Sequence, residues 1–219
     1  MTESGPGIER LFEERAVKSV SGTTRDGSDG RVANRLRNRE HVIDTFIELV
    51  NEGKDGTLEQ VIERSGVARR SIYRYFDDLS DLSMKVFRRV VAVADAEAQL
   101  PNPGVGPLPE RIATFAAIRL QTLAATHAFG LLARNRAGAN DDVQNGFAFV
   151  IKLVRLQLNT QFEPELTEID GERRERLLDT IILLTSFEGY DLLVRQLGRP
   201  VDVVETTWNE ALAALFDVA

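Results

Sequence analysis

The segment 68–76, ARRSIYRYF, carries the side chains best suited to contact nucleic acid. At helical spacing Ile72 and Phe76 face a core, while the polar side chains project to the other side. The candidate contacts are Ala68, Arg69, Arg70, Ser71, Tyr73, Arg74 and Tyr75. A major groove admits such a helix, and an arginine can donate two hydrogen bonds to guanine. A helical hairpin with a solvated charged face has the same pattern, so spacing alone leaves both interpretations open.

A second basic group, Arg35, Arg37 and Arg39, precedes this segment. Residues 31–75 contain nine Lys/Arg and seven Asp/Glu, a balance of +2, whereas residues 93–219 contain eleven and eighteen, a balance of −7. The acidity of the chain therefore lies in its C-terminal part. The three arginines are candidates for phosphate or minor-groove contacts, with an ordinary basic linker as the alternative.

Arg119, a charged residue among apolar ones, is a candidate for binding a ligand. Arg119 lies at the centre of a helix face that includes Phe115, Leu123 and His127. A guanidinium is not deprotonated in proteins, so a buried one must find an anion. Glu188 could supply it within the chain, or a ligand carboxylate or phosphate could enter a pocket; an exposed arginine on a misphased helix is the third possibility. The predicted pocket is lined by Phe115, Arg119, His127, Phe147, Ile151 and Val154.

Composition excludes several other chemistries. The 219 residues include no cysteine and two histidines, so we expect no disulfide, thiolate nucleophile or multi-histidine metal site. The acidic segment 163–172 does not have the spacing of a calcium loop. We therefore expect no enzyme, cofactor or metal. The N-terminus is acidic and lacks an apolar signal-peptide core, and no apolar run reaches the roughly 18 residues of a membrane span, so we expect a cytoplasmic protein without a membrane partner.

The elements that must position these groups are all predicted to be helices. A helix from 38 to Gly53 precedes a capping box, TLEQ, that begins a second helix at Thr57. A turn at Gly66 leads to the helix 68–76, and Asp77, Asp78 and Ser80 offer caps to a long helix that ends near 98. We predict a flexible arm over 1–34, a three-helix helix-turn-helix domain over 35–82, a connecting helix over 83–100 and a second helical domain over 101–219.

The second domain is expected to begin with a proline-rich loop over 101–109. Helices are predicted at 109–127, 128–137, 141–162, 172–197 and 201–217. The helix 172–197 is apolar nearly all round, which indicates burial on every face. One face meeting a second copy of the chain would explain this, and a fully intramolecular core is the alternative. The predicted dimer interface is Phe187, Tyr190, Leu193, Val194, Leu197, Val204, Trp208 and Leu212.

The sequence SGVARRSIYRYFDDLSDL resembles the signature of tetracycline-repressor-like (TetR-type) transcriptional regulators, and HVIDTFIELVNEGKDGTLEQVIERSG resembles their first two helices. The resemblance is specific over about 38–90; the rest matches in length and helical character. The chain departs from the family pattern at four positions. Ala68 replaces a capping serine, Ile62 a small alanine, Lys54 an aromatic residue and Leu79 a phosphate-binding lysine.

The resemblance implies a homodimer, built from the last two helices as a four-helix bundle, that binds a near-palindromic double-stranded operator. It places the phosphate contacts on Thr57 and Tyr73, and the base contacts on Arg69, Arg70 and Ser71. The function it implies is a repressor released by a small molecule of unknown identity. An all-helical adaptor is the remaining alternative, and it would not need the basic, aromatic helix 68–76.

Overall fold

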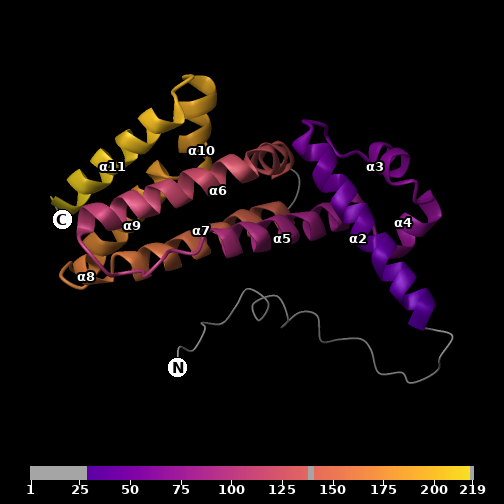
Figure 1. Ribbon diagram of the computed structural model, residues 1–219, viewed down its shortest axis with the longest axis horizontal. Coiled ribbons are helices and arrows are strands. Elements are labelled where there is room, and N and C mark those ends of the chain that lie inside the picture. Colours follow the sequence, from indigo (N-terminus) through magenta and orange to yellow (C-terminus); the bar gives the residue numbers. More distant parts are fainter. Residues whose placement is uncertain (1–28, 138–140, 218–219) are drawn as a thin grey trace.

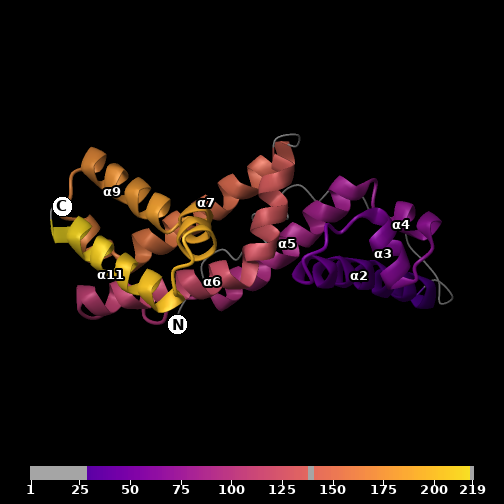
Figure 2. The same ribbon diagram turned by 90° about the horizontal axis from the view of Figure 1, so that it is seen from above.

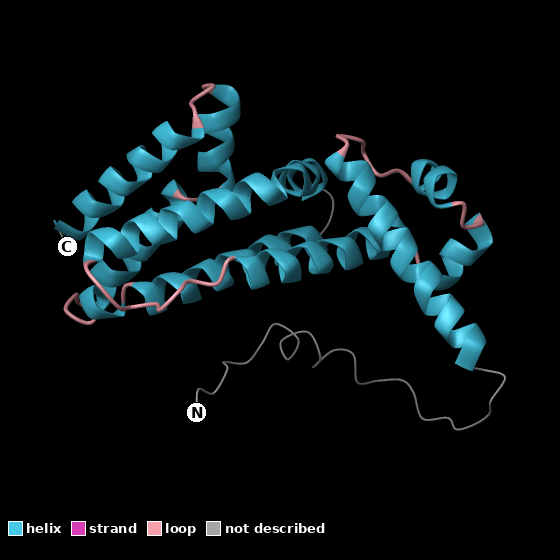
Figure 3. Ribbon diagram, viewed as in Figure 1, coloured by secondary structure: helices cyan, strands magenta, loops and turns pink. Residues whose placement is uncertain are grey.

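The computed structural model describes residues 29–137 and 141–217. Within these ranges the regular structure is helical and there is no strand (Figure 3). The fold class is therefore all-α, as predicted. None of the helices in the described ranges has the length and apolar content needed to cross a bilayer. The elements in chain order are α2 (Asp29–Asn51), α3 (Leu58–Ser65), α4 (Arg69–Tyr75), α5 (Leu79–Glu97), α6 (Leu108–Ala137), α7 (Asp141–Gln161), α8 (Glu163–Leu166), α9 (Gly171–Leu184), α10 (Phe187–Tyr190), the π-helical segment η1 (Asp191–Gln196) and α11 (Val201–Asp217).

The helices form an elongated molecule with two ends. Figure 1 shows α2, α3 and α4 at one end, and α8, α9 and α11 at the other. Helices α5, α6 and α7 run lengthwise between them. Figure 2 shows that the last turns of α6 run across the direction of its first part. The ends are thus joined by helices rather than by a flexible linker.

The first helix begins earlier than predicted. α2 starts at Asp29, so residues 29–34 are helical and the expected arm lies, for 1–28, outside the described residues. The prediction was based on apolar periodicity, which begins at Val42. The preceding turns are rich in arginine and asparagine and bury little, so they carry no periodic signal although their backbone is helical.

Two further helix boundaries differ from prediction. α6 is one helix where two, 109–127 and 128–137, were expected, because a single glycine, Gly130, weakens a helix without having to end it. A Cβ at this position would meet the ring of Phe187, so the glycine permits close packing. The predicted helix 172–197 is instead interrupted at Thr185, and Ser186 caps a new short helix by accepting from the Gly189 N–H at 3.0 Å.

The N-terminal core is built from α2, α3, α4 and α5 together with one end of α6. Phe46, Val61, Ile72 and Leu82 are buried in it, and Phe129 of α6 belongs to the same cluster. Two salt bridges also hold α5 to α2, since Arg89 pairs with Glu40 and, at 3.0 Å, with Asp44. Because Phe129 of α6 belongs to this core, a movement of α6 would shift the packing of the N-terminal helices.

Candidate nucleic-acid interface and internal pocket

A capped helix and a glycine turn precede α4. Thr57 Oγ1 accepts from the Gln60 N–H at 3.3 Å, and Gln60 Oε1 accepts from the Thr57 N–H at 3.0 Å, so the predicted capping box is confirmed. α3 ends at Gly66, whose φ of 65° is a left-handed conformation that glycine adopts without strain. These local signals set the angle at which α4 leaves α3.

A charged cluster orients α3 on α2. Arg64 donates to both carboxylate oxygens of Glu52, at 2.9 and 2.8 Å, and Lys54 donates to the same carboxylate at 2.8 Å. Hydrogen bonds from Arg64, and then from Lys54, lower the pKa of Glu52 to about 2. All three groups are solvent-exposed, so the cluster fixes geometry more than it adds stability.

α4 has one buried and one exposed side, as its sequence predicts. Ile72 and the following Phe76 are buried in the N-terminal core. The exposed residues of this segment are Ala68, Arg69, Arg70, Tyr73 and Arg74, while Ser71 and Tyr75 are half-buried. Ala68 occupies the N-cap and makes no side-chain hydrogen bond there, which is the expected consequence of replacing a serine.

The arginines of α4 differ in what they contact. Arg69 Nη2 donates to Glu59 Oε1 of α3 at 3.0 Å. The guanidinium of Arg74 lies 5.9 Å from the ring centroid of Tyr75. The described part of the chain offers the Arg70 side chain no hydrogen bond or ion pair. Arg70 and Arg74 could thus bind an external acceptor without first losing an internal one, whereas Arg69 would have to leave Glu59.

The three N-terminal arginines lie on α2 rather than in a linker. Arg35 and Arg37 are exposed, and Arg35 Nη2 donates to the Arg74 carbonyl at the end of α4, at 3.2 Å. Arg39 is half-buried and its guanidinium lies 6.0 Å from the ring centroid of Phe76. Arg35 is thus beside the exposed side of α4, whereas Arg39 packs on the core.

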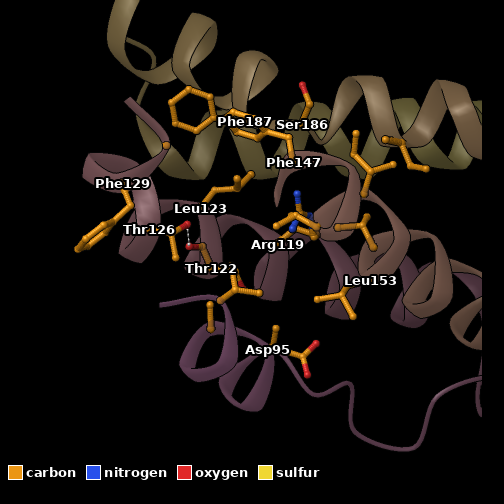
Figure 4. Close-up of a pocket in the computed structure, with 18 of the residues that line it drawn as sticks. Asp95, Arg119, Thr122, Leu123, Thr126, Phe129, Phe147, Leu153, Ser186 and Phe187 are labelled. Atoms are coloured by element: carbon orange, nitrogen blue, oxygen red, sulfur yellow. Dashed lines mark hydrogen bonds between the residues drawn. The ribbon is translucent and has the colours of Figure 1, made fainter. Parts of the chain in front are cut away.

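A cavity of about 550 Å³ lies between α5, α6, α7 and the segment that joins α9 to α10 (Figure 4). Most side chains that line it are apolar. Of the six residues predicted for a pocket, the structure brings together Arg119, Phe147, Ile151 and Val154. The wall formed by α5, which includes Phe87, Val90, Ala94 and Asp95, was not predicted, although apolar residues at helical spacing on α5 could have indicated it.

Phe115 and His127 do not line the cavity, so their assignment to the pocket was wrong. Phe115 is buried in a separate core, where its ring centroid lies 5.8 Å from that of Phe162. His127 is turned toward Asp191. The apolar face of α6 is broad and packs against more than one neighbouring element. Apolar residues that follow one another at helical spacing on α6 therefore face different parts of the molecule.

Arg119 is the deeply buried charge of the cavity. Its side chain is 7% exposed, and Nη2 donates to the Thr185 carbonyl at 2.8 Å. Nε has no hydrogen-bond partner among the described residues. Burial lowers the pKa of Arg119 to about 10, so the group stays charged at neutral pH. The Arg119–Glu188 pair, one of the three possibilities that the sequence left open, does not form: Arg119 donates to the Thr185 carbonyl, and Glu188 is exposed.

Asp191, a buried carboxylate next to the cavity, accepts hydrogen bonds from three side chains. His127 Nε2 lies 2.9 Å from Asp191 Oδ1, while Arg134 and Gln196 each donate to Oδ2 at 3.2 Å. The His127 ring also stacks on Phe187, with centroids 5.4 Å apart. The hydrogen bond from His127 is the main cause that keeps the pKa of Asp191 below its ordinary value. This network joins the second half of α6 to η1.

We expect Asp191→Asn to lower the free energy of unfolding by about 1.5–3 kcal/mol at pH 7, since it removes a charged acceptor from a buried network. Because the pKa of Asp191 is lower in the folded than in the unfolded chain, its stabilisation is present above the unfolded value, about 3.9, and is lost as pH falls through the folded value. The difference between wild type and variant should therefore shrink in acid. Urea unfolding at pH 7 and at pH 3 measures both effects.

Asp217→Asn is the control for this experiment, because it neutralises an exposed carboxylate on α11. It should change stability by less than about 0.5 kcal/mol at either pH. An Asp191→Asn protein as stable as the wild type at pH 7 would show that the network does not hold η1 to α6.

The residues predicted for a dimer interface divide into two groups. Tyr190, Val204, Trp208 and Leu212 are buried within the chain's own core, so they cannot form a surface for a second copy. Phe187, Leu193 and Val194 are half-buried against the same core. Leu197 alone of the eight is exposed, at 55%. The all-round apolar pattern thus reflects intramolecular packing at most of these positions.

Comparisons of this chain with protein-family models, with curated proteins and with solved structures gave no match.

Proposed function

We propose that the chain is a dimeric, sequence-specific DNA-binding transcriptional regulator of the cytoplasm, a repressor that a small molecule releases from DNA. The observation that carries this proposal is the two-sided character of α4. Ile72 and Phe76 anchor it in the core, and Arg69, Arg70, Tyr73 and Arg74 are left exposed together. In the proposal α3 and α4 are the helix-turn-helix pair, and α4 enters the major groove.

Phosphate contacts would surround the base-reading helix. Thr57 begins α3, so its backbone lies at the positive end of a helix, where anions bind favourably. Arg35 lies beside the end of α4, and Arg37 is exposed on the same helix, α2. The resemblance over 38–90 to tetracycline-repressor-like regulators supports the same placement. Arg35 and Arg37 would then compensate for the lysine that Leu79 replaces.

A homodimer would present two such helices to a near-palindromic site, about 34–36 Å apart or at a larger multiple of the helical turn. Exposed apolar side chains support an interface on the last helices of the chain. They are Leu183 on α9, Leu192 on η1, Leu197 in the following loop, and Val201 and Val203 on α11. This set replaces the buried residues that the sequence suggested, and α9 and α11 would supply the bundle helices.

Release by a ligand would act through α6 and α5. Both helices line the cavity, and both contribute side chains to the N-terminal core, Phe129 from α6 and Val86 from α5. A ligand that binds better to one arrangement of these helices shifts the population toward it. If that arrangement separates the two α4 helices by a distance that no longer fits DNA, the regulator dissociates.

The experiment that tests the proposal is binding to labelled duplex DNA over a series of salt concentrations, followed by fluorescence anisotropy. If six or more phosphates are contacted, affinity should fall by roughly 1,000-fold between about 50 and 200 mM salt. Tyr73→Phe should weaken binding to every duplex alike, as the loss of a phosphate contact does. A chain with no affinity for duplex DNA at low salt would contradict the proposal and favour the adaptor.

A further inference from the structure

We propose that the cavity binds an amphipathic anion, an apolar body with a single carboxylate or similar oxoanion, and that Arg119 is its counter-charge. This inference rests on the proposed function for its biological meaning, since the ligand would be the effector. The observations behind the inference do not involve DNA. They are a buried guanidinium and the mainly apolar cavity of about 550 Å³ that it lines, a volume that suits a small organic molecule.

Arg119 has hydrogen-bonding capacity that the chain does not use. The side chain has five N–H donors. Its one hydrogen bond within the described ranges is from Nη2 to the Thr185 carbonyl, and the buried Nε has no partner. A buried charge left without an opposite charge is costly. An oxoanion would supply both the missing acceptor and the missing charge.

The position of Arg119 in the cavity fits this role. Figure 4 shows Arg119 in the middle of the lining, between the α5 wall that carries Asp95 and the segment that carries Ser186. Phe147 and Leu153 of α7, and Leu123 of α6, line the same cavity. These side chains would contact the apolar body of the ligand while the guanidinium holds its head group.

Three carboxylates also line the cavity, and none of them pairs with Arg119. Asp179 pairs with Arg155, and Glu188 is exposed. Asp95 is half-buried, and desolvation raises its pKa. Arg119 is thus the most deeply buried charged group of the lining, whereas Asp95 is half-buried, Asp179 is paired and Glu188 is exposed. A cationic ligand would have to approach an uncompensated guanidinium.

The test uses two fluorescent probes with the same apolar body. One is 1-anilinonaphthalene-8-sulfonate, an anion, and the other is N-phenyl-1-naphthylamine, which lacks the sulfonate. Arg119→Met should weaken binding of the anionic probe by roughly 10- to 100-fold, because it removes charge-assisted hydrogen bonds. Binding of the neutral probe should change by less than about threefold. Lys152→Met is the matched control, since it removes an exposed cation next to the lining residue Ile151 and should alter neither probe.

A competition experiment on the wild-type chain tests the inference even if Arg119→Met does not fold. Dodecanoate should displace the anionic probe at a concentration at least about tenfold lower than dodecan-1-ol requires. Equal displacement by the acid and the alcohol would overturn the inference. Binding of a cationic dye such as rhodamine 6G in preference to the anionic probe would overturn it as well.

These outcomes separate the inference from the proposed function. Probe binding needs no DNA, so a chain that binds the anion through Arg119 but has no affinity for duplex DNA keeps the inference and loses the proposed function. A chain that binds DNA but shows no effect of Arg119→Met on the anionic probe loses the inference alone.

Discussion

Replacing Arg69 and Arg70 together by alanine should abolish sequence-specific DNA binding while the fold stays intact. Each lost bidentate contact to a base costs about 1–3 kcal/mol, so the two losses together amount to roughly 30-fold or more in affinity. Both side chains are exposed and neither belongs to the core, so circular dichroism and the thermal midpoint should match those of the wild type. Footprinting on a specific site measures the loss.

The single variants should not be equal. Arg69 is held by Glu59 at 3.0 Å and must leave that ion pair to reach a base, whereas Arg70 has no partner within the described ranges. Arg70→Ala should therefore cost more affinity than Arg69→Ala. Lys152→Ala, which removes an exposed charge far along the chain on α7, is the control. A double variant that footprints like the wild type would mean that α4 does not read the bases.

The second large effect is expected at the proposed dimer surface. Leu197→Glu would place an unpaired charge in an interface, and burying such a charge is expensive. The chain should then sediment as a monomer. Its affinity for the full site should fall by roughly 100-fold or more, because the two half-sites are no longer bound as a linked pair.

The choice of residue matters for this experiment. Tyr190→Glu would disturb the chain's own core, so it could not separate loss of the dimer from loss of the fold. Leu156→Glu is the control, since Leu156 is 64% exposed and lies on α7, which contributes no residue to the proposed surface. A wild-type chain that sediments as a monomer at micromolar concentration would contradict the dimer.

Features set by neighbouring residues could be predicted from the sequence. The capping box at Thr57 and the left-handed Gly66 were predicted from short patterns. Asp78, which accepts from the Asp81 N–H at 2.8 Å, was one of three predicted candidates for the N-cap of α5. The two sides of α4 also followed from 3.6-residue spacing. These features depend on local hydrogen bonds and on one buried stripe, both of which are visible in a short segment of sequence.

Features set by distant neighbours could not be predicted. Periodicity identified Arg119 as a charge on an apolar face, but it could not say which element would cover that face. Trp208 and Leu212 have the same apolar pattern whether they meet α6 or a second copy. The helix ends at Leu184 and a new one begins after Ser186, and the capping Ser186 is the local signal of this break. Tertiary packing decides which element covers each of these side chains, and the periodicity of a single sequence does not reveal that packing.

We propose that the exposed side of α4 reads duplex DNA as one half of a dimer. Selection from a pool of random duplexes, followed by sequencing and footprinting of the enriched fragments, tests this role of α4. We expect enrichment of a near-palindrome whose half-sites lie about one helical turn, or a larger multiple of it, apart, and loss of the footprint in the Arg69→Ala/Arg70→Ala variant. A pool that shows no enriched sequence, together with equal retention of DNA by wild type and variant, would contradict it.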